Sequence, residues 1–196
     1  MKLSAKYVII TLYFSYTKNL RMIIMLKAIG SRKELTVNGY YDCISDIIDS
    51  IHLRQLKNIT HHICTTRFQH CINVSYYSYV ICKKLHLDAR SAARAGLLHD
   101  LFFYNRKSYN ASRTKGQLSH SNMHSLIAAE NASKHFNISD LERDIIEKHM
   151  WPATKQMPKY KEGYVIVLVD KYCALLEFVL PNLKKCADFA VRNDKK

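Results

Sequence analysis

The sequence predicts an all-α fold, a bundle of six to seven helices, and three observations lead to this prediction. From residue 40 onward, apolar residues recur at intervals of three and four, which is the spacing of the buried stripe on a helix. No stretch after residue 40 alternates polar and apolar residues for long enough to indicate a strand. The 5 Gly and 3 Pro among 196 residues are too few for the many turns of a β-sandwich or barrel.

The first helix is expected over residues 41–57, where isoleucines at positions 44, 47, 48 and 51 fall on one face. Apolar stripes and breaks in the pattern predict five further helices, over residues 66–85, 89–102, 120–135, 139–149 and 162–180.

Residues at the helix ends support these limits. Asp88 can cap the helix that begins at residue 89, and Ser139 with Glu142 forms a capping box. Pro181 is expected to stop the helix over 162–180, after which a short seventh helix can follow. Residues 103–119 are polar and basic, so they predict a loop.

The first 39 residues differ from the rest and are expected to form an extension of a single domain over residues 40–196. The apolar run over 7–16 is too short to span a bilayer, which needs about 20 residues, and no membrane span is expected elsewhere. Two interpretations remain: an ordered appendage, or translated sequence upstream of a functional start at Met22 or Met25. The second is favoured, because nothing after residue 40 requires the extension.

Composition narrows the function classes. Thirty Lys and Arg against 16 Asp and Glu give a net charge of +14, which favours an anionic partner such as a nucleotide, a phosphate ester, nucleic acid or an acidic membrane surface. The 6 cysteines include no C-x-x-C pair, which excludes a zinc finger and indicates reduced thiols in a cytoplasmic protein.

The 10 histidines carry more information than the charge. Five predicted helices each hold histidine or aspartate positions of the kind that bind metal, namely His70, His99 with Asp100, His124, His149 and Asp170. Side chains from facing helices of a bundle can converge on one interior point. Imidazole and carboxylate together suit iron, manganese, zinc, cobalt or nickel, whereas calcium prefers oxygen ligands alone.

The order of these residues resembles the HD-domain superfamily of metal-dependent phosphohydrolases. The motif R-x-x-H at residues 67–70 is followed by A-G-L-L-H-D at 95–100, by later histidines and by D-K at 170–171. The pieces H-x-x-x-H at 120–124, K-H-M-W-P at 148–152 and D-K-Y-C-A at 170–174 resemble a small bacterial branch of that superfamily. The resemblance extends over about residues 60–180.

The resemblance implies a helical HD domain whose core holds one or two divalent transition metal ions. It implies metal ligands at His70, His99, Asp100, His124, His149 and Asp170, with Asp100 bridging two ions when both are bound. It also implies that a metal-activated hydroxide attacks phosphorus, with catalytic roles for Asp100 and for Lys171, which stabilises negative charge. His120 competes with His124 as a ligand; His124 is favoured, because it lies one turn further into the predicted helix.

Two basic segments without acidic residues, over 103–119 and 148–161, adjoin the ligand-bearing helices and can attract a small phosphorylated substrate. The candidate substrate-binding residues are His120, Arg106, Lys107, Lys148 and Lys155. Two alternatives stay open. One is a di-iron oxygenase, which the same superfamily pattern supports in some relatives, and the other is a basic nucleic-acid-binding protein without catalysis. The sequence does not decide the oligomeric state.

Overall fold

The structure is a computed structural model that describes residue 28 and residues 39–61 and 65–193, with side chains described as far as residue 179. The predicted extension over 1–39 therefore lies outside the described residues, apart from Ala28 and Gly39. The described part of the chain consists of helices and one isolated β-bridge between Thr60 and Thr66, so the all-α prediction is confirmed. None of these helices is long and apolar enough to cross a membrane.

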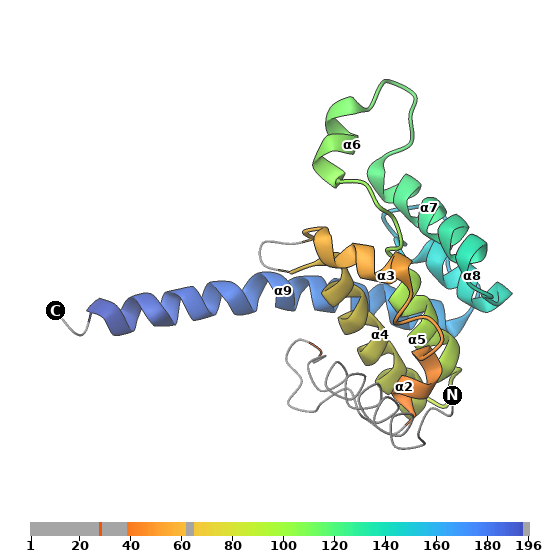
Figure 1. Cartoon of the computed structure of the whole chain (residues 1–196), viewed down its shortest axis with the longest axis horizontal. Helices are drawn as coiled ribbons and strands as arrows, with labels where there is room; N and C mark the ends of the chain where they lie inside the picture. The colour runs from red at the N-terminus through yellow and green to blue at the C-terminus, as the bar shows by residue number, and fades with distance from the viewer. Residues whose placement is uncertain (1–27, 29–38, 62–64, 194–196) are drawn as a thin grey trace, which may run out of the picture.

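Helices α4 (Arg67–Lys84) and α5 (Ala89–Leu98) form the central pair (Figure 1). They approach so closely that a Cβ atom added to Gly96 would lie 2.8 Å from the Cα of Ser75. Glycine is therefore required at position 96, because the Ser75 backbone, unlike a flexible side chain, cannot move away from an added Cβ atom. Asp88 caps α5 by accepting a hydrogen bond from the Ser91 amide at 2.9 Å, as the sequence predicted. The close packing sets the C-terminal end of α5 beside α4.

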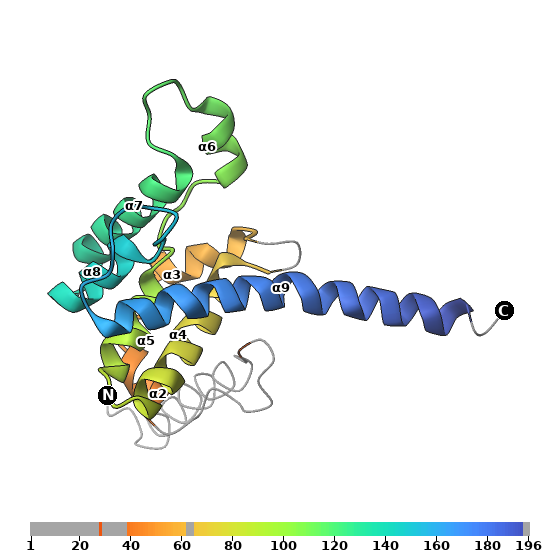
Figure 2. The same cartoon turned by 180° about the vertical axis from the view of Figure 1, so that it is seen from behind.

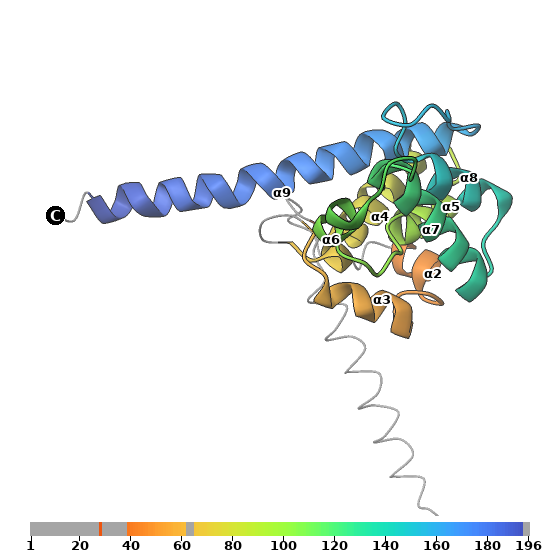
Figure 3. The same ribbon diagram turned by 90° about the horizontal axis from the view of Figure 1, so that it is seen from above.

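Helix α9 (Lys161–Asn193) packs on α4, α5 and α8 with its first half, and its second half projects beyond the body of the molecule (Figures 2 and 3). The prediction that Pro181 ends this helix was wrong, as was that of a separate seventh helix. Proline removes one backbone hydrogen bond, but leucine, lysine and alanine, which favour helix, stand on both sides of it.

The predicted helix over 41–57 is also corrected. It is divided into α2 (Tyr40–Ile44), α3 (Ile51–Gln55) and a 3-10 turn (Leu56–Asn58). Ser50 adopts an extended backbone, and its hydroxyl accepts a hydrogen bond from the Leu53 amide at 3.3 Å, so α3 has its own N-cap. Ile44, Ile47 and Ile48 are all buried around the intervening turn. Apolar residues at helical spacing are thus buried together here although no continuous helix carries them.

Residues 103–119 contain a further helix, α6 (Arg106–Ser112), where the sequence predicted only a loop. Asn105 caps it by accepting a hydrogen bond from the Lys107 amide at 2.8 Å. Figure 1 shows α6 standing apart from the rest of the bundle, above α7. Because α6 buries no residue, its sequence lacks the apolar stripe by which helices are predicted.

Helices α7 (His120–His135) and α8 (Asp140–Lys148) complete the bundle and pack against each other. The predicted capping box is present: the Ser139 hydroxyl accepts from the Glu142 amide at 3.2 Å, and the Glu142 carboxylate accepts from the Ser139 amide at 2.8 Å. The chain then runs without helix from His149 to α9, and this segment faces the same end of the bundle as the start of α7.

Candidate metal centre

The six residues predicted as metal ligands converge in the interior of the bundle. Their sources are the first turns of α4 (His70), the end of α5 (His99 and Asp100), α7 (His124), the residue after α8 (His149) and α9 (Asp170). The four histidines and Asp100 are at most 5% exposed, and the Asp170 side chain is 17% exposed. The structure therefore brings together residues that are 100 positions apart in the sequence.

These residues form two adjoining groups. In the first, the Asp170 Oδ1 lies 3.0 Å from the His70 Nε2 and 3.8 Å from the His99 Nε2. In the second, the Asp100 Oδ1 lies 3.4 Å from the His124 Nε2 and 3.9 Å from the His149 Nε2. His99 and Asp100 are the two residues directly after α5, and each group receives one of them.

Three of the histidines are oriented in the same way by the backbone. The Nδ1 atom of His99 lies 2.8 Å from the Gly96 carbonyl oxygen, that of His124 lies 2.7 Å from the His120 oxygen, and that of His149 lies 2.8 Å from the Ile146 oxygen. A carbonyl oxygen only accepts, so each Nδ1 carries the proton. In a neutral ring the Nε2 then presents a lone pair to the interior.

The Nε2 atoms of these three rings lie in the interior of the bundle. The Nε2 atoms of His124 and His149 are 3.0 Å apart, and the His99 Nε2 is buried with no hydrogen-bond partner among the described residues. Burial, reinforced by the neighbouring His99 and His124, lowers the pKa of His149 to about 3, so this ring stays neutral at pH 7. A cation in the interior would satisfy these atoms, and the nitrogen and carboxylate donors suit a divalent transition metal.

Both aspartates are held in the charged form. Burial alone would raise the pKa of Asp100, but His99, His124, His61 and His149 hold it well below its usual value. Burial opposes the ionisation of Asp170 as well, and its hydrogen bond to His70 lowers its pKa below the usual range. The centre thus keeps two carboxylates ready for a cation near neutral pH.

Two residues at this centre were missed by the sequence analysis. His61 stacks on the His70 ring with centroids 4.2 Å apart, and its Nδ1 lies 3.7 Å from the Asp100 Oδ2. Glu177 is fully buried and contacts the Nδ1 of His70. His61 lies outside any helix, so no periodicity marked it. Glu177 follows Asp170 by seven residues, on the same face of α9, and that spacing was a signal that could have found it.

A cavity of about 800 Å³ opens over the second group. It is lined by three of the predicted substrate-binding residues, Arg106, Lys107 and His120, and by His61, Asp100, His124, His149 and Asp170. The His120 ring stacks on that of His124 at 4.6 Å, and its Nδ1 lies 3.2 Å from the Tyr104 hydroxyl. Burial and the neighbouring His124 lower the pKa of His120 to about 4, so it is neutral at pH 7.

The remaining two candidates for substrate binding, Lys148 and Lys155, and the catalytic candidate Lys171 do not line this cavity. The Lys171 ammonium donates to the carbonyl oxygens of Trp151 and Val167, both at 3.2 Å. Lys148 pairs with Asp144 on its own helix, and Lys155 is exposed. Of the two basic segments predicted to receive an anionic substrate, only the one over 103–119 contributes cations to the cavity wall.

Comparison with models of protein families matches residues 67–175 to the HD domain. The matched span contains all six predicted ligands, and both His61 and Glu177 lie outside it. Neither the curated proteins nor the solved structures yielded a match to the chain.

Proposed function

The chain belongs to the HD domain family, most of whose members are metal-dependent hydrolases, and from this premise we propose that it hydrolyses a small phosphate ester or nucleotide-like substrate. The observation that carries the proposal is the placement of the second group of ligands, Asp100, His124 and His149, on the wall of a cavity that also presents Arg106 and Lys107. Metal donors and fixed positive charge in one cavity are what phosphoryl transfer requires.

In this proposal His70, His99 and Asp170 would hold one ion, and Asp100, His124 and His149 would hold the other. When bound, such ions lower the pKa of water and polarise a phosphoryl oxygen. The candidate metals are iron, manganese, zinc, cobalt and nickel, because all of them bind imidazole and carboxylate ligands.

The chain's own side chains then have separate tasks. Arg106 and Lys107, on the first turn of α6, attract the phosphate and take up its negative charge. His120 is a neutral hydrogen-bonding group on the wall, held by Tyr104. The Lys171 ammonium donates to two carbonyl oxygens. We therefore assign it to holding the Trp151 segment against α9, in place of the catalytic role that the resemblance implied.

The test is a screen of phosphate monoesters, diesters and nucleotides with the metal-free chain reconstituted with Mn²⁺, Fe²⁺, Co²⁺, Ni²⁺ or Zn²⁺. Phosphate release by the wild type, absent from the His99→Ala/Asp100→Ala variant and retained by His135→Ala, supports the proposal. His135 is the matched control because it lies on α7 outside the cavity wall and stacks on His52. Equal behaviour of all three proteins with every metal contradicts it.

Two outcomes of the same screen separate the alternatives. Two bound irons with a charge-transfer absorption band, and substrate oxidation without phosphate release, would favour the oxygenase. Nucleic-acid binding that survives the His99→Ala/Asp100→Ala change and weakens steeply with salt would favour a binding protein.

A further inference from the structure

Glu177 is a carboxylate that the bundle buries completely. Glu177 lies on α9, two turns after Asp170, and is 0% exposed. Burying a charged carboxylate is unfavourable unless hydrogen bonds replace those that the group made to water. A residue of this kind is therefore expected to have specific partners, and its partners lead directly to the metal centre.

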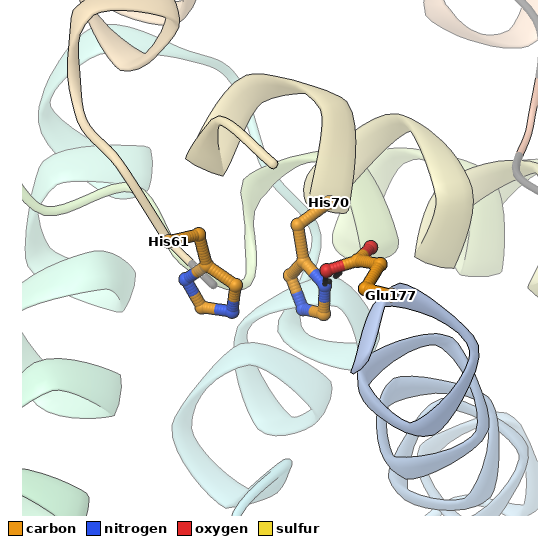
Figure 4. Close-up of side chains that lie close together, drawn as sticks. All are labelled: His61, His70 and Glu177. Carbon is orange, nitrogen blue, oxygen red and sulfur yellow. Dashed lines mark hydrogen bonds and ion pairs between the residues drawn. The ribbon is translucent and has the colours of Figure 1, made fainter. Parts of the chain in front are cut away.

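Both Glu177 oxygens contact the His70 Nδ1, at 3.1 and 3.2 Å, and Oε1 also accepts a hydrogen bond from the Asn73 amide at 2.7 Å. The Asn73 side-chain oxygen in turn accepts from Gln69 at 2.9 Å. Figure 4 shows His70 between His61 and Glu177, with the carboxylate reaching the ring from α9. The opposite nitrogen of His70, Nε2, lies 3.0 Å from Asp170. Two acids on one helix thus bracket the ring.

This arrangement distinguishes His70 from the other three histidines of the centre, whose Nδ1 atoms donate to neutral carbonyl oxygens. A hydrogen bond to a carboxylate is stronger than one to a carbonyl group. It fixes the proton on Nδ1 and increases the electron density at Nε2, which makes Nε2 a better metal donor.

The two groups of ligands also differ in access. Asp100, His124 and His149 line the cavity, whereas His70 and His99 do not. An ion held by the second group would therefore face the cavity. Of the first group, Asp170 lines the cavity, so an ion held there would be less accessible.

We propose that Glu177 is a positioning residue for His70, and that it makes the site of His70, His99 and Asp170 the tighter and more slowly exchanging of two unequal metal sites. This inference rests on the metal centre of the proposed function, but not on the substrate. The ion at the site of Asp100, His124 and His149 is then the one that exchanges.

A competing arrangement makes Glu177 a ligand itself. Ligand atoms of His61, His70 and Glu177 lie within 4.8 Å of one another, close enough to surround a single ion. The two arrangements differ in what His61 does. In the competing arrangement His61 supplies one of the three ligand atoms, whereas a positioning role of Glu177 through the Nδ1 of His70 does not involve His61.

The experiment is a titration of the metal-free full chain with Co²⁺, followed by equilibrium dialysis and by visible absorption. The key variant is Glu177→Gln. Its matched control is Glu162→Gln, since Glu162 is also a buried acid of α9, 8% exposed, but accepts from the Asp88 amide at 3.0 Å, away from the centre. His61→Ala tests the competing arrangement.

For the wild type we expect two Co²⁺ ions, one retained and one removed quickly by a chelator. Glu177→Gln should weaken the tight step by about 10- to 100-fold and alter the absorption of the first equivalent, with the second step unchanged. Glu162→Gln and His61→Ala should keep the tight step. If Glu177→Gln does not fold, Asn73→Ala, which removes the support of Glu177, should weaken the same step several-fold.

The proposal is overturned if Glu177→Gln, or Asn73→Ala in its place, leaves the tight step unchanged or weakens both steps equally. It is also overturned if Glu177→Gln and His61→Ala each lose a whole equivalent of Co²⁺. A wild type that binds no transition metal ion refutes the proposed function as well. A wild type that binds two ions unequally but releases no phosphate refutes the hydrolase proposal alone.

Discussion

The Nε2 atoms of His124 and His149 face each other across 3.0 Å, while the Nδ1 of each ring donates to a carbonyl oxygen of its own helix region. With each Nδ1 protonated, the neutral form of both rings would place one Nε2 lone pair against the other. The contact is favourable only when a cation shares it, either a proton on one ring or a metal ion that binds both nitrogens. The stability of the folded chain should therefore respond to metal.

We predict that a transition metal ion raises the melting temperature of the wild type and that His149→Ala reduces this increase. At a free concentration of 100 times Kd, an ion adds about 2.7 kcal/mol of stability, which is roughly 5–10 °C for a domain of this size. Thermal unfolding with metal and with EDTA measures the difference. His135→Ala, the control, should keep the full increase; an equal increase in His149→Ala would show that this ring is not a ligand.

The metal-free chain should be most stable near pH 6.5. Below that pH, His149 and His120 bind protons in the unfolded chain but not in the folded one, because burial lowers their pKa values to about 3 and about 4. The free energy of unfolding therefore falls as the pH is lowered. Above pH 6.5, the titration of His70 lowers the free energy of unfolding as the pH rises. Burial disfavours its charged form, but Asp170 and Glu177 raise its pKa to about 10, so its stabilising contribution is lost as pH rises from 6.5 to 10.

Urea unfolding in EDTA as a function of pH checks this prediction. His70→Gln should flatten the decline above pH 6.5 and leave the low-pH side unchanged. A wild-type chain whose stability keeps rising between pH 6.5 and 9 would contradict the assignment of a charged His70 between two carboxylates.

The convergence of the six proposed ligands could be predicted, because each lies in a helix or directly after one and because their order along the sequence resembles that of the HD domain. His61 could not be predicted in this way, because it lies in a non-helical connection whose path depends on tertiary contacts. Glu177 lies within an apolar stretch, and the signal that could have marked it was its spacing of seven residues from Asp170, on the same face of the helix.

The fold was predicted less completely at its edges. The prediction of one helix over 41–57 was wrong, because apolar spacing does not distinguish a continuous helix from two short helices joined by a buried turn. Lys148 and Lys155 failed to reach the cavity because charge along a segment does not tell which way its side chains point.

The cations of α6 should govern substrate binding more than the chemical step. We predict that Arg106→Ala and Lys107→Ala each raise KM about 2- to 5-fold, as expected for exposed charges, with kcat little changed and with smaller effects at high salt. Lys155→Ala, an exposed cation away from the cavity, is the control. A loss confined to kcat would place these residues at the reacting group instead.

Arg94 should contribute strongly to the stability of the folded chain. Its guanidinium is buried and donates to Asp46 at 2.6 Å, to Glu142 at 2.8 Å and to the Asn137 carbonyl oxygen at 3.2 Å. Arg94→Met should lower the free energy of unfolding by about 3–5 kcal/mol, because it leaves the buried Glu142 carboxylate without its cationic partner, although the Ser139 amide still donates to it. Arg90→Met, at an exposed position one turn earlier, should change it by less than about 0.5 kcal/mol. Equal effects would show that the Arg94 network contributes little.

The most direct test of the central claim is the rate of phosphate release as metal ions are added to the metal-free chain one equivalent at a time. The account predicts no release without metal, a rate that rises with occupancy and reaches its limit by the second equivalent, and no release at any occupancy from the His99→Ala/Asp100→Ala variant. Release that is independent of added metal, or equal in the wild type and the variant, would contradict it.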